Sequence, residues 1–211
     1  REVEIASVDL AALLGQPTSS SVSGDLTGQL ASLSPLRVDG RLRLRPSDYG
    51  ALRVDSANVR GETLDRQISF SARTFLPDSG EIRAFGRYGM EREATRLVVD
   101  SLHYARLDLR ALLPQGDSTA VPFTDLNGVA GGWARQGRGG WVGNLTVQLG
   151  ASSVGRESIE GGRLSAVVDS STAEVTVEID TPEGRVSGEG RVEDLRTNPA
   201  LIVPETRFRS V

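Results

Sequence analysis

The sequence predicts an all-β protein in which one elongated antiparallel sheet is curled into a groove. Apolar and polar residues alternate with a period of two along most of the chain, as in "LRVDGRLRLR" (residues 36–45). This is the pattern of strands with one apolar and one solvated face. Hydrophobic residues make up 38% of the chain, aromatic residues 5%, and there are 24 glycines. Few large side chains and many glycines favour a curled sheet over two packed sheets.

We expect ten or more short strands joined by tight turns. The clearest strands are "QISFSA", "NLTVQL", "EVTVEID" and "GRVSGEGRVE", at residues 67–72, 144–149, 174–180 and 184–193. Gly, Pro, Asp and Ser cluster in "RPSDYG" (45–50), "LPDSGE" (76–81) and "TPEG" (181–184). Such clusters indicate turns, so the strands are expected to follow one another as a meander.

Two similar phrases break this alternation, "VDLAALLGQP" (residues 8–17) and "LDLRALLPQG" (107–116). In each phrase an Asp (Asp9 or Asp108) stands where it can cap a helix, and Leu residues follow at the i, i+3, i+4 spacing. Gly in the first phrase and Pro in the second then stop the helix. We therefore expect one or two helical turns at each place, with their Leu face laid on the sheet.

The similarity of these phrases extends into the strands that follow them. "DLTG" (25–28) matches "DLNG" (125–128), and "SGEIRAFGR" (79–87) matches "EGRVSGEGR" (183–191). Self-similarity at a fixed period is typical of a tandem repeat in which each unit mainly contacts its neighbours. The sequence thus predicts two β-groove repeats, residues 1–106 and residues 107–211.

Composition argues against several classes of function. The net charge is −4, so nucleic acid is not an expected partner. There is no Cys, which leaves no disulfide and no thiolate metal site. No apolar run approaches the roughly 20 residues that span a bilayer. The chain does not begin with Met, and we expect it to be a fragment of a longer protein.

Candidate catalytic residues are few, and we expect no enzyme, no cofactor and no metal site. His103 is the only His, and a single His completes neither a catalytic triad nor a zinc set. The carboxylate pairs Glu91 with Glu93 and Glu157 with Glu160 could serve a glycosidase. They stand in highly charged, loop-like runs, which favours solvated faces.

The glycine-rich stretch "GGWARQGRGG" (residues 131–140) could suggest a phosphate cradle. It lacks the Lys-Ser/Thr of a P-loop and the strand–helix setting of a dinucleotide fingerprint. A flexible hairpin turn is the better interpretation. Trp133 and Trp141 flank this turn and are expected to pack across it, unless one of them sits at the mouth of a groove.

The whole pattern of "DL..LL", a gap, "DL.G" and Gly-punctuated alternating strands resembles the AsmA-like superfamily, and most of all its TamB members, the translocation and assembly module type. The resemblance implies a segment of a bacterial envelope protein that shelters phospholipid acyl chains between the inner and outer membranes, in the periplasm of a Gram-negative-type cell. It also implies an inner-membrane anchor in the full-length chain, a possible role in outer-membrane protein assembly, and a TamA-type outer-membrane barrel partner that would bind regions outside this fragment.

The resemblance carries over no catalytic residue, only a row of inward apolar residues that would line the groove. These residues are Leu42, Leu44, Ile68, Phe70, Ile82, Leu97, Val99, Leu145, Val147, Leu164, Val175, Val177, Ile179, Val186, Leu201 and Val203. The alternative is a structural or adhesive β-repeat whose apolar face is closed and dry. An apolar face packed against a second sheet would favour that alternative.

Overall fold

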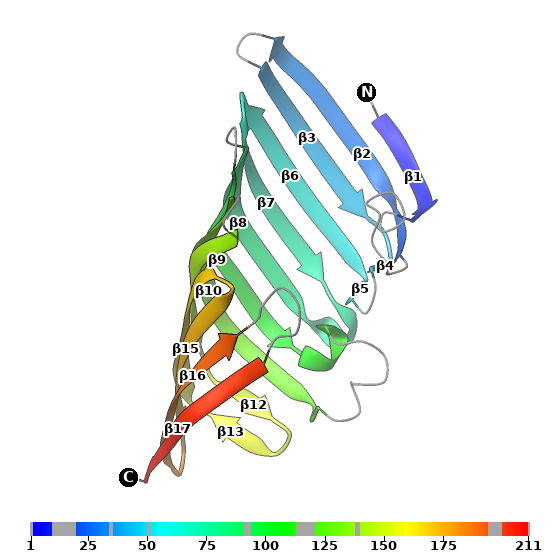
Figure 1. The fold of residues 1–211 in the computed structure, drawn as a ribbon. Coiled ribbons are helices and arrows are strands. Elements are labelled where there is room, and N and C mark those ends of the chain that lie inside the picture. Colours follow the sequence, from blue (N-terminus) through cyan, green and yellow to red (C-terminus); the bar gives the residue numbers. More distant parts are fainter. Residues whose placement is uncertain are drawn as a thin grey trace.

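The computed structural model describes residues 2–9, 20–33, 36–49, 52–90, 94–112, 121–137, 140–193 and 200–210. All seventeen strands belong to one antiparallel sheet (Figure 1). Strands β1 to β7 are seen face on in Figure 1, whereas β10, β15 and β16 are seen nearly edge on, so the sheet twists strongly along its length. The predicted all-β fold with one large antiparallel sheet is confirmed.

The strands follow each other along the chain with two short 3₁₀ helices between them. Their bounds are β1 Glu2–Val8, β2 Ser20–Leu33, β3 Leu36–Leu44, β4 Ser47–Tyr49, β5 Leu52–Val54, β6 Ser56–Leu64, β7 Gln67–Phe75, η1 Pro77–Ser79, β8 Glu81–Met90, β9 Thr95–Leu107, η2 Leu109–Leu112, β10 Thr124–Gly137, β11 Gly140–Leu149, β12 Ser152–Val154, β13 Glu157–Ile159, β14 Gly161–Ser170, β15 Thr172–Thr181, β16 Gly184–Glu193 and β17 Ala200–Ser210.

Across the sheet the order of the long strands follows the chain. The successive pairs are β1–β2, β2–β3, β3–β6, β6–β7, β7–β8, β8–β9, β9–β10, β10–β11, β11–β14, β14–β15, β15–β16 and β16–β17. The hairpins β4–β5 and β12–β13 leave this order and pair with the first residues of β2 and β10. Strands β1 and β17 lie at opposite ends of the molecule, so the sheet is open (Figure 1).

Two predicted turns are largely occupied by strands, although the second does contain the predicted hairpin. "RPSDYG" contains β4, because its Ser47 and Tyr49 pair with β5 in a short hairpin. "GGWARQGRGG" is mostly strand as well: β10 runs to Gly137 and β11 starts at Gly140, so only two residues separate the strands. In both stretches cross-strand pairing outweighs the turn preference of the local sequence.

The second predicted helix is a single 3₁₀ turn, η2, and Asp108 caps it as expected. The Asp108 carboxylate accepts a hydrogen bond from the backbone N–H of Arg110 at 3.1 Å, and its carbonyl accepts one from Ala111 at 3.0 Å. Leu109 is 36% exposed, so this side chain is not sealed onto the sheet. Residues 10–19, which hold the first predicted helix, lie outside the described residues.

The buried core is small and local. Leu76, Tyr104 and Leu107 form a buried cluster at the ends of β7 and β9, and the β5 residues Leu52 and Val54 pack against it. In the described chain there is a single sheet and no second sheet. The greater part of the sheet therefore has no packed layer over either face.

One hydrogen-bond arrangement occurs where the chain passes from β3 into the short β4–β5 hairpin. Ser47 Oγ donates to the carbonyls of Arg45 (2.8 Å) and Ser23 (3.3 Å) and accepts from the N–H of Ser23 at 3.1 Å. The side chain of Ser23 in turn accepts from the N–H of Ser7 at 3.0 Å. Ser7 has a positive φ of 48°, so the end of β1 is held in an unusual backbone conformation.

The second short hairpin has the same arrangement. Ser152 Oγ donates to the carbonyls of Gly150 (2.9 Å) and Asn127 (3.4 Å) and accepts from the N–H of Asn127 at 2.9 Å. The side chain of Asn127 accepts from the N–H of Arg106 at 3.0 Å, and Arg106 has a positive φ of 51°. Ser152 thus takes the place that Ser47 has at the first hairpin, and Asn127 takes the place of Ser23.

These contacts change the expected match between "DLTG" and "DLNG". Gly24 follows Ser23 and Gly128 follows Asn127, so Gly128 corresponds to Gly24 and not to Gly28. A Cβ on Gly24 would stand 2.1 Å from the Arg43 carbonyl oxygen, and one on Gly128 would stand 2.2 Å from that of Gln148. The contacts thus align the two stretches four residues away from the match of "DLTG" with "DLNG", which follows the letters and not the close backbone contacts.

Candidate functional site: the apolar face of the sheet

The strand registers bring the predicted inward residues together in four rows that cross the sheet. Residues directly opposite each other in an antiparallel pair point to the same side. The Leu42 row contains Leu26, Leu42, Val59, Ala72, Ala84, Leu102, Ala130, Val147, Leu164 and Val177. The Leu44 row, two residues away along each strand, contains Leu44, Ala57, Thr74, Ile82, Tyr104, Gly128, Leu149, Gly162, Ile179 and Val186.

Two further rows lie on the same side. The Phe70 row contains Gly28, Gly40, Gly61, Phe70, Gly86, Val99, Gly132, Leu145, Ala166 and Val175, and the Ile68 row contains Val38, Thr63, Ile68, Tyr88, Leu97, Ala134, Gly143, Val168, Ala173, Val192 and Leu201. We call this side of the sheet the apolar face. Every predicted residue except Val203 falls in one of the four rows. Val203 lies at a register shift in β17.

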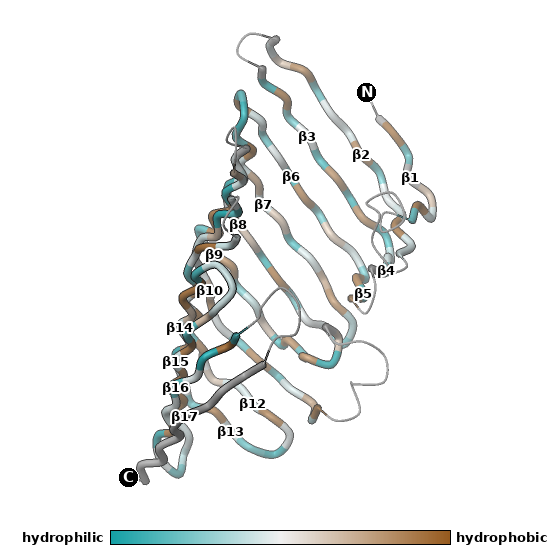
Figure 2. The backbone as a smooth tube through the Cα atoms, in the orientation of Figure 1, coloured by the Kyte–Doolittle hydropathy of each residue, from teal (hydrophilic) through white to brown (hydrophobic). Residues whose placement is uncertain are grey.

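Most side chains on the apolar face are only partly covered, whereas Ala57, Tyr104 and Ala173 are buried. Leu97 is 37% exposed and Leu145 43% exposed, and none of the predicted residues whose side chains are described is fully buried. Figure 2 shows hydrophobic and hydrophilic residues alternating along the strands, so the apolar residues of each strand gather on one side. In the described chain this face is therefore open to an apolar occupant.

The prediction missed several members of the rows. Leu26 and Leu30, which pairs with Val38 of the Ile68 row, alternate within β2 and could have been found from the sequence. Leu102 could not be found in this way, because β9 is irregular there. Its pairing with β8 shifts register between Phe85 and Gly86, and its pairing with β10 shifts register as well. A bulge adds one residue to a strand and so reverses which positions face inward. Leu97 and Leu102 consequently share a face although one position is odd and the other even.

The opposite face is dominated by charged side chains. Glu81 accepts hydrogen bonds from Arg73 (2.5 Å) and Arg83 (2.6 Å). The bond from Arg83 is the largest influence that lowers the pKa of Glu81. Phe85 and Val167 are also exposed on this face, so it is mixed and not uniformly polar. Exposed ion pairs of this kind contribute little to stability and chiefly keep the face solvated.

A cavity of ≈ 740 Å³ lies on the apolar face over β9, β10, β11 and β14. We call it the Trp141 cavity after the residue at its hairpin end. Leu97, Val99, Leu145 and Val168 line it, and none of the described residues around it is charged. A larger hollow of ≈ 1490 Å³ over β2, β3, β6 and β7 has Arg, Asp and Glu residues in its lining. The Trp141 cavity is therefore the less polar of the two hollows.

The two tryptophans lie on opposite faces and do not pack across their hairpin. Trp141 of β11 pairs with Gln136 of β10, so these two side chains share a face. Trp133 stands three residues before Gln136 in β10 and pairs with Asn144. Because side chains alternate along a strand, Trp133 points to the other face. Trp133 instead lies beneath the guanidinium of Arg96, with 5.8 Å between Cζ and the ring centroid. The register thus leaves Trp141 alone on the apolar face, at the rim of the cavity.

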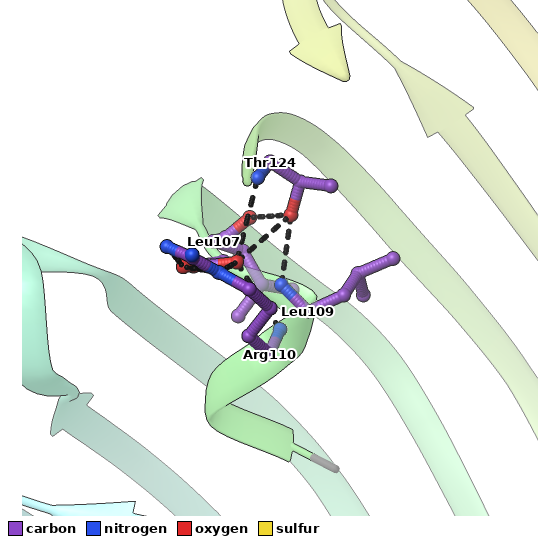
Figure 3. Close-up of polar contacts among 5 residues, drawn as sticks. Leu107, Leu109, Arg110 and Thr124 are labelled. Atoms are coloured by element: carbon purple, nitrogen blue, oxygen red, sulfur yellow. Dashed lines mark hydrogen bonds and ion pairs between the residues drawn. The ribbon is translucent and has the colours of Figure 1, made fainter. Parts of the chain in front are cut away.

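The most buried polar cluster joins β9, η2 and β10 (Figure 3). Arg110 Nε and Nη2 donate to Asp108 Oδ2 at 2.8 and 2.6 Å. Thr124 Oγ1 donates to the Leu107 carbonyl and accepts from the Leu109 N–H at 2.8 Å. Burial raises the pKa of Asp108, but hydrogen bonds from Arg110 and Thr124 outweigh burial and lower it. These polar groups bond to one another, so the cluster fixes the chain where β9 leads through η2 toward β10.

The described candidate catalytic residues, His103, Glu157 and Glu160, are all exposed. His103 lies within β9, exposed, between Arg83 and Val129 on neighbouring strands. Glu157 and Glu160 are exposed, and Glu91 and Glu93 lie outside the described residues. Within the described ranges no group of His, Asp and Glu is arranged to hold a metal ion. Neither short helix of those ranges has the length and apolar character that bilayer crossing requires.

Comparison of the chain with protein-family models, with curated proteins and with solved structures gave no match.

Proposed function

We propose that this chain is a section of a non-enzymatic lipid conduit of the bacterial envelope, which shelters phospholipid acyl chains along the apolar face of its sheet. The observation that carries the proposal is the open apolar face: four rows of residues continue across the strands, and most of their described side chains are only partly covered. A sheet that served only as a structural or adhesive repeat would gain stability by closing this face.

The energetics suit a surface along which lipids move. Burying one CH₂ group is worth about 0.8 kcal/mol, so an acyl chain gains much on leaving water for this face. A lipid that arrives from a bilayer exchanges one apolar environment for another, and its net free-energy change is small. A continuous aliphatic row therefore allows movement without deep traps, and it requires no catalytic group.

We further propose that the sheet consists of two copies of one unit, the first ending with β9 and the second starting with β10. The repeated hydrogen bonds of Ser47 and Ser152 support this, as do the positive φ values of Ser7 and Arg106. A unit that repeats its backbone contacts can extend the apolar face by addition of further units. The envelope location, the inner-membrane anchor, and the link to outer-membrane protein assembly through a TamA-type partner rest on the resemblance to TamB-type proteins.

Photocrosslinking tests the proposal directly. A benzophenone side chain at Leu44, Val147 or Val177 should capture phosphatidylethanolamine from vesicles incubated with the purified chain. The same group at Arg43 or Glu178, which stand on the opposite face by register, should capture much less. Equal capture from both faces, or none from either, would contradict the proposal.

Charge substitutions give the matching functional test. Val147→Asp and Val177→Arg place a charge on the apolar face and should abolish phospholipid transfer between vesicles, because a charge among acyl chains is costly. Gln148→Asp and Glu178→Arg make the same changes at adjacent, exposed positions and should leave transfer intact. Normal transfer by folded Val147→Asp and Val177→Arg proteins would rule the conduit out.

A further inference from the structure

We propose that the Trp141 cavity is a discrete binding station for one acyl chain of an amphiphile, with the polar head at the β10–β11 hairpin and the tail pointing along the strands. This rests on the proposed lipid conduit, and it adds that the conduit is not uniform. The cavity volume of ≈ 740 Å³ lies within the range of roughly 300–1,000 Å³ typical of small-ligand sites.

The walls of the cavity differ from one end to the other. Near the hairpin the apolar face carries Gln136, Trp141 and Ser170, which pair across three strands. From there toward the middle of the strands the lining side chains of the apolar face are aliphatic, from Leu97 to Leu102. Trp133 and Asn144 also belong to the lining, but they pair with each other on the opposite face by register. A Trp ring beside amide and hydroxyl groups is the combination found where a polar head meets an apolar tail. The polarity of the lining thus orients the ligand.

The length of the cavity agrees with an acyl chain. It extends along β10 from Ala130 to Gly137, and at about 3.4 Å per residue these residues span roughly 24 Å. The acyl chains of one bilayer leaflet occupy about 15 Å, half of a hydrocarbon core of about 30 Å. One extended tail therefore fits along the strand direction.

The floor of the cavity is built by close backbone contacts. A Cβ on Gly132 would stand 2.2 Å from the Asn144 carbonyl oxygen, and one on Gly143 would stand 2.3 Å from that of Trp133. The glycines allow β10 and β11 to approach each other, and the bulge in β9 beside them bends the sheet. The hollow is therefore a consequence of the backbone and not a chance gap between side chains.

A hydrocarbon tail fits this floor better than a peptide does. Each of β9, β10, β11 and β14 pairs with a strand on both sides, so their backbone groups are already hydrogen-bonded to one another. A peptide laid on them would bury its own N–H and C=O groups with few partners, at a cost. A hydrocarbon tail has no such groups to satisfy.

The test uses contact quenching of tryptophan by stearic acid that carries a nitroxide near its carboxyl end or near its methyl end. In Trp133→Phe, Trp141 remains as the reporter, and we expect saturable quenching at one ligand per chain, stronger with the nitroxide near the carboxyl end. In Trp141→Phe, Trp133 is the reporter. Trp133 belongs to the cavity lining, but its side chain stands on the opposite face by register, so it should be quenched only weakly and without saturation. Equal quenching of the two tryptophans, or stronger quenching by the methyl-end label, would overturn the station or its orientation.

A filling substitution separates the station from the conduit. Ala134→Phe, made in the Trp133→Phe protein, should raise the apparent dissociation constant at least about tenfold, since the ring displaces several methylene groups of the ligand. Ala72→Phe, on the apolar face of β7 away from the cavity, should not. Circular dichroism must show both proteins folded.

The results distinguish failure of the station from failure of the conduit. Equal effects of Ala134→Phe and Ala72→Phe, with photocrosslinking on the apolar face retained, would overturn the station and leave the conduit standing. Loss of both signals would overturn both proposals. Displacement of the labelled stearic acid by an unfolded apolar peptide, but not by palmitic acid, would overturn the choice of an acyl chain as ligand.

Discussion

Strands β2–β8 and β10–β16 share a backbone scheme and differ in how their apolar face is filled. Both sections begin with a strand of 14 residues and branch into a short hairpin held by one serine hydroxyl. In the Phe70 row the first section carries Gly28, Gly40 and Gly61, whereas the second carries Gly132, Leu145 and Ala166. The comparison shows that backbone hydrogen bonds can be kept constant while side-chain volume on the same face changes.

The comparison also separates two kinds of glycine. A Cβ on Gly132 would stand 2.2 Å from a backbone oxygen, so this position requires glycine for close strand approach. A Cβ on Gly28 would meet its nearest neighbour, the Asp39 carbonyl oxygen, only at 3.8 Å. Gly28 is therefore not required by packing, and its absent side chain leaves the face bare.

The largest expected effect is the difference in stability between alanine substitutions at these two glycines. Gly132→Ala should lower the free energy of unfolding by about 3 kcal/mol, because a backbone oxygen cannot move aside cheaply. Gly28→Ala should leave it unchanged or raise it by about 0.5–1 kcal/mol, since alanine loses less backbone entropy on folding. Urea denaturation with a constant m-value would measure both changes. Similar destabilisation by the two substitutions would show that the distinction is wrong.

The two junctions before the long strands provide the next comparison. Before β10, Asp108 is 6% exposed and binds Arg110 and Thr124. Before β2, the exposed Asp9 accepts from the N–H and hydroxyl of Ser20 at 3.2 and 2.9 Å. We expect Asp108→Asn to cost about 2 kcal/mol, as removal of a charge-assisted buried hydrogen bond does, and Asp9→Asn to cost less than about 1 kcal/mol.

The pH dependence of stability provides a control for the Asp108→Asn substitution. The pKa of Asp108 is lowered in the folded protein, so its contribution is present above the unfolded pKa of about 3.9 and is lost as the pH falls through the folded pKa. Asp108→Asn should therefore lose less stability on acidification below about pH 4 than the parent does. Parallel acid-denaturation curves for the two proteins would contradict the assignment.

The smallest expected effect concerns the residues that pair with Gly24 and Gly128. Gly24 pairs with Ile5, and Gly128 pairs with Tyr104, whose hydroxyl is buried and has no hydrogen-bond partner in the described chain. Tyr104→Phe should be neutral or stabilise the protein by up to about 1 kcal/mol, because it removes an unsatisfied polar group.

Alkaline titration checks the same residue. Burial raises the pKa of Tyr104, so above about pH 10 the unfolded chain loses this proton before the folded chain does. Stability should then fall with rising pH in the parent and fall less in Tyr104→Phe. A clear loss of stability in Tyr104→Phe at neutral pH would mean that the hydroxyl has a partner.

Much of the candidate site could be predicted because alternation alone assigns faces within a strand. Val175, Val177 and Ile179 follow the period of two through β15 without interruption, and the register places all three in the predicted rows. Leu102 and Trp141 could not be predicted in the same way. A bulge in β9 reverses the period for Leu102, and only the two-residue hairpin between Gly137 and Gly140 decides the face of Trp141.

The sequence by itself determined that this chain forms an antiparallel sheet with one apolar side, because side chains in a strand must point alternately to its two faces. It also determined the cap at Asp108, which depends on residues close in the chain. The tertiary structure decided which strands are neighbours, where bulges reverse the alternation, which glycines permit close contact, and where the Trp141 cavity forms. These features depend on pairings between residues far apart in the sequence, and local patterns do not carry that information.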